Sequence, residues 1–130
     1  MIFRSSLTSL ALASLLVAAG CSSMPMMASA PTLTVDGVLT GKNSMTLYTF
    51  DKDAAGAGKS VCNGPCATNW PPLVAAADAK DMGDYTVVTR DDGSKQVAYK
   101  GKPLYFWAKD AKPGDKTGDG MNSVWHVAKD

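Results

Sequence analysis

Apolar and polar residues alternate in short runs along the chain, and this period-two alternation is typical of half-buried β-strands. The runs that we expect to form strands are residues 32–36, 47–50, 85–90, 104–107 and 124–128. Between YTVVTRD and SKQVAYK stands Asp92-Gly93, which predicts a β-hairpin closed by a two-residue turn. The pattern therefore predicts a mainly β fold, a small domain with antiparallel strands.

Helix is expected only at Cys66–Trp70, as a single turn that Pro71-Pro72 stops. Composition agrees, because all 12 acidic residues are Asp and the chain carries 12 Gly and 7 Pro, which favour turns over helices. A length of 130 residues suits one compact domain. The composition therefore argues against a helix-rich bundle.

The chain repeats itself at an offset of 57 residues. Residues 47–59 read LYTFDKDAAGAGK and residues 104–116 read LYFWAKDAKPGDK, with the Leu, Tyr, Lys, Asp, Ala and Lys positions identical. Such self-similarity indicates a duplication. We predict one β domain over residues 32–130, built from two similar repeats of about 57 residues, about 32–80 and 85–130, that share a core and are related by pseudo-twofold symmetry.

The N-terminus, residues 1–20, has the features of a secretory signal peptide: a charge at Arg4, an apolar stretch over Leu7–Ala19 and small residues before Cys21. The apolar stretch is shorter than the roughly 20 residues that a membrane-spanning helix needs. We therefore expect this segment to be removed on export.

The end of this segment, Val17-Ala18-Ala19-Gly20-Cys21, resembles the lipobox of bacterial lipoproteins, although Leu is commoner where Ala18 stands. The resemblance implies cleavage before Cys21, a diacylglycerol on its thiol and acylation of the new amino group, for example with palmitate. The membrane is then a partner of the protein through the lipid on Cys21. Because Ser22 and not Asp follows the cysteine, the resemblance implies the outer membrane, facing the periplasm, if the cell is Gram-negative. A plain secreted protein would instead leave Cys21 as a free thiol.

Residues 21–31 are predicted to form a flexible tether between the lipid and the domain, since they are mostly small and polar. The exceptions are Met24, Met26 and Met27. Thioethers are soft ligands, so these methionines are also candidates for Cu(I) binding, although a membrane-proximal linker is the simpler interpretation.

Within each repeat the motif Tyr-x-(Phe/Trp)-x-x-Asp recurs. Its residues are Tyr48, Phe50 and Asp53 in the first copy and Tyr105, Trp107 and Asp110 in the second. The two aromatic side chains of a copy share one strand face, and the aspartate follows where strand gives way to loop, so that its carboxylate can accept backbone N–H bonds. We interpret the motif as a structural staple; the alternative is an aromatic surface that stacks a quinone, sugar or peptide, with the two aspartates at its rim.

The pair Cys62 and Cys66 is the sharpest chemical feature. In an oxidising compartment a close pair of cysteines forms a disulfide, and Asn-Gly-Pro supplies the turn between them. Alternatives are a dithiol switch, for which Cys-x-x-x-Cys lacks the usual Cys-x-x-Cys spacing, and a copper site formed with His126. His126 is the only histidine, and in its predicted strand we expect it to be partly exposed.

Both copies of the motif, the segment Cys62-Asn-Gly-Pro-Cys66-Ala-Thr-Asn-Trp70-Pro-Pro-Leu and the closing Val124-Trp125-His126-Val127 together resemble the secreted-repeat lipoproteins named for that motif. The resemblance covers nearly the whole chain from about residue 32. It implies an architecture and a location in the cell envelope, and no reaction.

The net charge and the absence of known catalytic motifs argue against several classes of protein. A net charge of +1 excludes a typical nucleic-acid binder, and nothing resembles a nucleophile elbow, a zinc-protease helix or a phosphate-binding loop. We therefore expect a lipid-anchored, non-enzymatic binding or envelope-maintenance module with no catalytic residue, cofactor or metal, whose protein or small-molecule partner is unidentified. The alternative is a periplasmic copper-binding or thiol redox protein that uses Cys62, Cys66 and His126.

Overall fold

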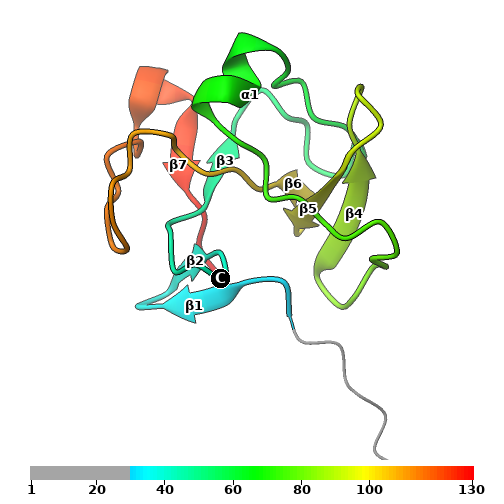
Figure 1. Ribbon diagram of the computed structural model, residues 1–130, viewed down its shortest axis with the longest axis horizontal. Coiled ribbons are helices and arrows are strands. Elements are labelled where there is room, and N and C mark those ends of the chain that lie inside the picture. Colours follow the sequence, from blue (N-terminus) through cyan, green and yellow to red (C-terminus); the bar gives the residue numbers. More distant parts are fainter. Residues whose placement is uncertain (1–29) are drawn as a thin grey trace, which may run out of the picture.

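A computed structural model describes residues 30–130 (Figure 1). Within these residues the strands are β1 (Leu33–Val35), β2 (Val38–Thr40), β3 (Tyr48–Phe50), β4 (Tyr85–Thr89), β5 (Lys95–Tyr99), β6 (Lys102–Pro103) and β7 (Trp125–Val127). The helical elements are α1 (Pro65–Asn69) and a single 3₁₀ turn, η2 (Met121–Ser123). The predicted fold class is confirmed, since the domain is mainly antiparallel β with almost no helix. The predicted signal peptide, Cys21 and the tether methionines lie outside the described residues.

The strands form three small antiparallel sheets, β1–β2, β3–β7 and β4–β5–β6. The β3–β7 sheet joins the two repeats, because β3 belongs to the first repeat and β7 to the second. Figure 1 shows these two strands side by side. Their register pairs Tyr48 with Val127 and Phe50 with Trp125. The two halves of the chain are therefore interleaved and share one structure.

The hairpin predicted around Asp92-Gly93 is present as β4–β5, but its loop is longer than the expected two residues. The Arg90 amide donates to the Ser94 carbonyl at 2.8 Å, and the Gly93 amide donates to the Arg90 carbonyl at 2.9 Å. Residues 91–93 thus form a three-residue loop, and Gly93 takes the left-handed conformation (φ 87°) that this loop type requires at its last position. The two-residue turn was the wrong prediction.

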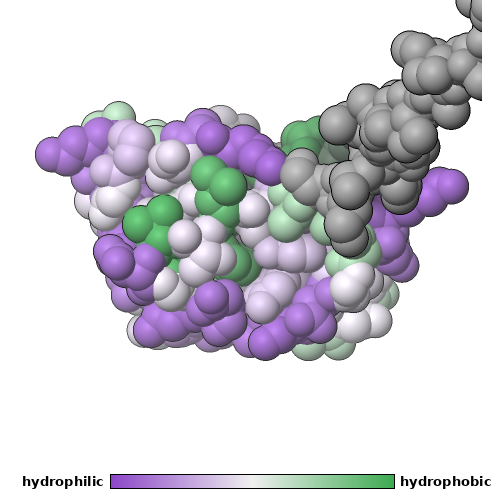
Figure 2. Space-filling model, turned by 90° about the horizontal axis from the view of Figure 1, so that it is seen from below, coloured by the Kyte–Doolittle hydropathy of each residue, from purple (hydrophilic) through white to green (hydrophobic). Residues whose placement is uncertain are grey.

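A second hairpin, β1–β2, was not predicted. Its turn is Asp36-Gly37, with φ of 51° and 78°, and two successive positive φ values are characteristic of the tight turn that suits the twist of β-strands. All three side chains of β1 are exposed. Figure 2 views the domain from the side on which β1 lies, and there the hydrophobic side chains form a few separate patches within a mostly hydrophilic face.

The strand expected over residues 104–107 is wrong as a regular element. β6 ends at Pro103, and after it Tyr105 alone forms isolated bridges, to Tyr48 on one side and to Pro72 on the other. The Phe106 amide then donates to the Pro71 carbonyl at 2.7 Å. The segment changes partner at each residue, so it is an extended strap that ties the helix–proline segment to β3.

The predicted helical turn is confirmed as α1, one residue earlier than expected. Pro65 occupies its first turn, where a missing N–H costs nothing. The Trp70 amide still donates to the Cys66 carbonyl at 2.8 Å, and Pro71-Pro72 end the helix as expected. This turn directs the Trp70 side chain into the core.

The core consists of two adjoining clusters. The aliphatic cluster contains the buried residues Leu39, Leu47, Ala75, Val97, Leu104 and Ala128. The aromatic cluster contains Tyr48, Cys62, Trp70, Tyr105, Trp107 and Trp125. Every aromatic in the second cluster comes from the repeated motif or from the tryptophan that follows it, and these residues form the candidate site.

Candidate functional site

Four aromatic rings are stacked in the centre of the domain. Phe50 stacks on Trp125 with a centroid distance of 4.1 Å, Trp125 on Trp70 at 3.8 Å, and Trp70 on Trp107 at 4.0 Å. The two ends of the stack are the equivalent motif positions of the two repeats, and its middle is the pair of tryptophans that follow them. The stack is therefore itself close to twofold symmetric.

The two motif tyrosines contact this stack edge-on. Tyr48 meets Trp70 at a centroid distance of 5.3 Å, and Tyr105 meets Trp125 at 5.2 Å. Stacked and edge-to-face pairs each add about 0.5–1.5 kcal/mol beyond the burial of area. Tyr48 and Tyr105 are 0% exposed and Trp107 is 8% exposed, so the faces of these rings are covered by one another. In the structure these three rings therefore offer little open surface on which a ligand could stack, while the fourth motif aromatic, Phe50, is half-buried.

One glycine allows the stack to be closed on its outer side. A Cβ at Gly118 would lie 2.6 Å from the Trp70 ring and 3.0 Å from the Trp107 ring, closer than atoms can pack. Gly118 itself is buried, and its amide donates to the Tyr48 hydroxyl at 3.3 Å. The loop before β7 can therefore lie directly against the tryptophans only because this residue has no side chain.

The tyrosine of each repeat donates a hydrogen bond to the aspartate of the other. Tyr48 Oη donates to Asp110 Oδ2 at 2.6 Å, across 62 residues of sequence. Tyr105 Oη likewise donates to Asp53 Oδ2, across 52 residues. Between the two bonds, the backbones of the tyrosines pair directly, with N–O distances of 2.8 and 3.0 Å. The pseudo-twofold axis passes between Tyr48 and Tyr105, and we call the two bonds the crossed pairs.

The second oxygen of each carboxylate holds the loop that follows it. Asp53 Oδ1 accepts the Val61 amide at 2.7 Å, and Asp110 Oδ1 accepts the Thr117 amide at 3.0 Å and the Thr117 hydroxyl at 2.5 Å. The expectation that these aspartates accept backbone N–H bonds is confirmed. The donors lie eight and seven residues downstream, so each carboxylate braces a whole loop and does not form a local Asx-turn.

Burial sets the protonation of the crossed pairs. Burial, followed by the hydrogen bond to Asp110, raises the pKa of Tyr48 well above its usual range, and burial and Asp53 do the same to the pKa of Tyr105. Burial also raises the pKa of Asp53, against the lowering effect of its hydrogen bonds from Tyr105 and Val61 and of the charge of Arg90. The tyrosines are therefore fixed as donors.

The predicted disulfide between Cys62 and Cys66 is present, with an S–S distance of 2.02 Å. It closes the turn that leads into α1, and Cys62 is 0% exposed. The bond therefore anchors the first long loop against the aromatic cluster. The second long loop has no cysteine and is held through Asp110 and Thr117 instead.

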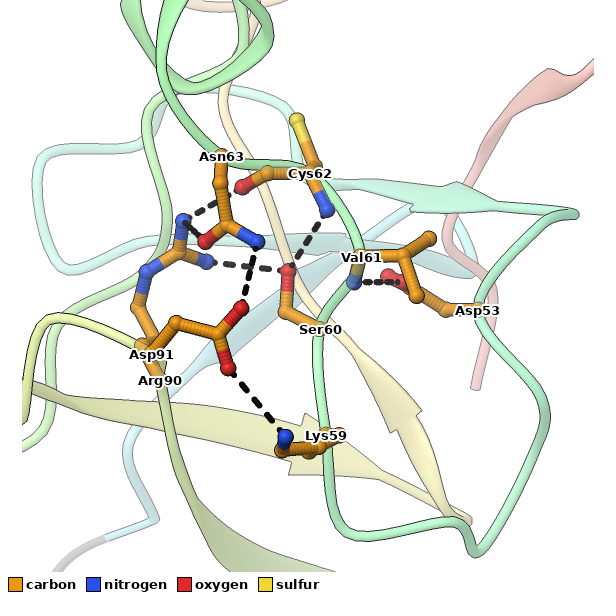
Figure 3. Close-up of polar contacts among 8 residues, drawn as sticks. All are labelled: Asp53, Lys59, Ser60, Val61, Cys62, Asn63, Arg90 and Asp91. Carbon is orange, nitrogen blue, oxygen red and sulfur yellow. Dashed lines mark hydrogen bonds and ion pairs between the residues drawn. The ribbon is translucent and has the colours of Figure 1, made fainter.

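A buried guanidinium links this loop to the hairpin. Arg90, which directly follows β4 and is 4% exposed, donates from Nη2 to the Cys62 carbonyl and from Nη1 to Ser60 Oγ at 3.0 Å and Gln96 Oε1 at 2.7 Å. Figure 3 shows the Arg90 side chain directed toward the loop, while Asp91 beside it contacts Asn63 and Lys59. Ser60 Oγ in turn lies 2.5 Å from Tyr105 Oη. The cluster thus connects the disulfide loop to one crossed pair.

Sequence reasoning missed Arg90. A signal was present, because the chain has only two arginines, the other being Arg4, and otherwise uses lysine. A lysine cannot bond several acceptors in one plane as a guanidinium does, so a single arginine beside a hairpin is a candidate for a buried polar network.

His126 lies on the outward side of β7, and its side chain is half exposed, as expected. Its Nε2 lies 2.8 Å from Asp51 Oδ2, in the residue directly after β3. Within residues 30–130 the structure contains no group of three or more His, Cys, Asp or Glu side chains placed to hold a metal ion. Cys62 and Cys66 are bonded to each other, so a copper site that uses their thiolates with His126 would first need reduction of the disulfide.

Comparison with known protein families also finds two repeats in this chain. The profile of a family described as a secreted repeat of unknown function matches residues 33–74 and, a second time, residues 86–129. The chain belongs to this family. The two matches coincide with the two halves that the crossed pairs join. No curated protein and no solved structure matches the chain significantly.

As a secreted repeat, the domain acts outside the cytoplasm or in the cell envelope. Among the helices of residues 30–130, none has the length and apolar character needed to cross a membrane.

Proposed function

We propose that this chain is a lipid-anchored, non-enzymatic binding module of the cell envelope, with Cys21 as its attachment point and the secreted repeats as its rigid head. The observation that carries the proposal is the pair of crossed tyrosine–aspartate bonds. The polar groups of the repeated motif are buried and bonded to one another, so they stabilise a scaffold and are not available to a substrate.

Anchoring is supported by the lipobox-like end of the signal segment. Burial of acyl chains contributes about 0.8 kcal/mol per CH₂, and two or three chains together hold a small domain stably on a bilayer. Ser22 after Cys21 favours the outer membrane, facing the periplasm, if the cell is Gram-negative. Binding is then the task of the exposed surface of the head, and the tether of residues 21–31 gives the head reach.

Mass spectrometry of the protein purified from membranes tests the anchor. We expect a species that begins at Cys21 and carries the mass of a diacylglycerol and a further acyl chain, labelled when cells grow on tagged palmitate. Cys21→Ala should abolish both the added mass and membrane fractionation, while Cys62→Ser should leave both unchanged. A mature chain without acyl mass, released into the soluble fraction, would contradict the proposal.

The copper or thiol redox alternative is tested on the same material. If it is right, reduction of the purified protein in the presence of Cu(I) gives a stoichiometric complex that Cys62→Ser or His126→Ala abolishes. A module that only binds through its surface should take up no copper beyond the amount bound by a Cys62→Ser, Cys66→Ser, His126→Ala variant.

A further inference from the structure

A shallow hollow of about 290 Å³ lies on the outer surface beside the β3–β7 sheet. Its floor includes Thr49 of β3 and His126 of β7, which are direct partners in the ladder and so present their side chains on the same face. The turn between β5 and β6 and the segment after β7 form its walls. The hollow is on the face opposite to the aromatic stack, because Phe50 and Trp125 point inward from the neighbouring positions of the same strands.

Lysines dominate the walls. They are Lys100 from the β5–β6 turn, Lys102 at the start of β6 and Lys129 from the C-terminal segment. All three are exposed, and within residues 30–130 the ion pairs are Lys59–Asp91 and His126–Asp51, so an acidic partner neutralises none of the three. Asp51 is the acidic residue among those that line the hollow, and it is paired with His126. The hollow therefore carries a net positive charge.

The backbone holds one of these lysines in an unfavourable conformation. Lys100 has φ 49°, at the first position of a two-residue hairpin turn that Asn or Asp usually occupies. A non-glycine residue other than Asn or Asp is uncommon in this left-handed region, and such strain is concentrated at functional sites. The turn itself does not explain the choice of lysine at this position. The Lys100 ammonium group lies 5.2 Å from the centroid of the Tyr99 ring, which also lines the hollow.

The turn is also held firmly in place against the first repeat. Gly101 has φ 81°, and a Cβ there would lie 2.6 Å from the Gly56 nitrogen, whose N–H donates to the Gly101 carbonyl at 2.9 Å. The Lys100 amide donates to the Asp84 carbonyl at 2.8 Å. These contacts fix the backbone of the turn, and with it the starting points of the Lys100 and Lys102 side chains, both of which line the hollow.

From this arrangement we propose that the hollow is a binding site for a phosphate-bearing ligand. The lysine ammonium groups are compact point charges suited to phosphate oxygens, and the Thr49 hydroxyl and the His126 imidazole lie on the floor as hydrogen-bonding groups. The volume is at the lower end for ligand pockets and fits a phosphate ester head of a small molecule or of a phospholipid. The inference rests on the proposed binding function and names the ligand class of the module.

The single histidine of the chain provides a direct measurement, because its imidazole C–H signals in a proton NMR spectrum come from the hollow and from nowhere else. We expect inorganic tripolyphosphate, titrated at constant pH into the mature protein in a non-ionic detergent, to shift these signals saturably. A triple variant, Lys100→Gln, Lys102→Gln and Lys129→Gln, should raise the dissociation constant by about tenfold or more, since each lysine near an anionic surface contributes appreciably to the attraction.

The matched control removes three exposed lysines elsewhere, with the same change of net charge: Lys80→Gln, Lys112→Gln and Lys116→Gln. It should change the dissociation constant less than twofold. Equal weakening by the two triple variants would show that only the overall charge matters and would overturn the site, as would the absence of a saturable shift in the wild-type protein.

A second arm separates the two sources of phosphate. The same protein is placed in non-ionic micelles with and without phosphatidylglycerol. A shift of the His126 signals with phosphatidylglycerol that the lysine variant loses assigns a lipid headgroup, whereas a shift with tripolyphosphate alone assigns a soluble phosphate compound. Lipid attachment at Cys21 is read from the protein mass and not from this titration, so failure of the phosphate site and failure of the proposed anchor are distinguished.

Discussion

The hydroxyl of Tyr48 donates a hydrogen bond to the carboxylate of Asp110, which belongs to the other repeat. Its symmetry mate is the bond from Tyr105 to Asp53, and between them the two tyrosine backbones pair with each other. The motif of each repeat is therefore complete only when the second repeat is in place. Several consequences of this arrangement can be measured.

Replacement of Tyr48 by Phe should lower the free energy of unfolding by about 1.5–3 kcal/mol, because the buried carboxylate of Asp110 then loses a hydrogen-bond donor that it cannot replace with water. Urea unfolding followed by tryptophan fluorescence measures the change. Tyr99→Phe is the matched control, since it removes the hydroxyl of a half-buried tyrosine without leaving a buried carboxylate unpaired. If the two variants lose equal stability, the crossed pair contributes nothing specific.

Asp53 should make the stability of the protein depend on pH. Burial raises its pKa in the folded state above the value of about 3.9 for an unfolded chain, so the folded protein binds this proton more readily. Its contribution to stability is then fully present below the unfolded pKa and is lost as the pH rises through the folded pKa. The unfolding free energy of the wild type minus that of Asp53→Asn should therefore increase as the pH falls from 7 to about 4. A difference that stays constant or shrinks on acidification would contradict the raised pKa.

Strand locations were largely predictable from sequence because alternation reports directly which side chains face the core. The prediction failed at residues whose hydrogen-bond partners are distant in the sequence. Tyr105 was placed in a continuous strand, yet it bridges Tyr48 on one side and Pro72 on the other, and no local pattern encodes such a change of partner. The turn at Asp36-Gly37 was encoded locally and was overlooked, since both of its φ values are those that an Asp-Gly turn favours.

For the candidate site, the repeated motif predicted which residues are involved and that their role is structural. It did not predict which tyrosine bonds to which aspartate. That Asp53 accepts backbone N–H bonds followed from its place after a strand. That its tyrosine partner is Tyr105 and not the nearby Tyr48 depends on how the two repeats pack, which a linear repeat does not reveal. Arg90 was missed for the same reason, since its acceptors other than Gln96 lie in a loop about 30 residues away.

Arg90 should tolerate neither a neutral nor a conservative replacement. Arg90→Met leaves the Cys62 carbonyl and the side chains of Ser60 and Gln96 without the donor that they share. We expect the free energy of unfolding to fall by about 2–4 kcal/mol. Arg90→Lys should lose nearly as much, because one ammonium group cannot replace the two separate nitrogens, Nη1 and Nη2, that donate in the guanidinium plane. Lys95→Met, which affects a single exposed bond to Thr89, should stay within about 0.5 kcal/mol. Full rescue by lysine, measured by thermal unfolding, would show that only the charge is needed.

Loss of the disulfide should weaken the domain without unfolding it. A ring as short as Cys62–Cys66 restricts the unfolded chain by about 2 kcal/mol, which is modest beside the contacts of the aromatic cluster. Addition of reductant, or the double substitution Cys62→Ser and Cys66→Ser, should lower the melting temperature by several degrees and leave the near-ultraviolet circular dichroism of the tryptophans in place. Complete loss of that signal at room temperature would mean that the ring is required for folding.

Gly118→Ala should disturb the tryptophan stack. The added Cβ would lie 2.6 Å from the Trp70 ring, and overpacking of this kind costs about 1–3 kcal/mol. We expect a lower melting temperature together with a changed tryptophan circular dichroism band. An alanine variant with the stability and spectrum of the wild type would show that the loop before β7 does not rest on the rings.

The crossed pairs also constrain how this chain can evolve. One repeat on its own has a tyrosine without its aspartate and an aspartate without its tyrosine, whereas two copies of it would satisfy both. A single repeat could therefore have been stable as a symmetric homodimer before fusion joined the copies in one gene. After fusion the two halves still depend on each other, since a substitution in one motif removes a hydrogen-bond partner of a residue in the other motif. Neither half can keep both crossed pairs if the other half is deleted or its motif changes alone.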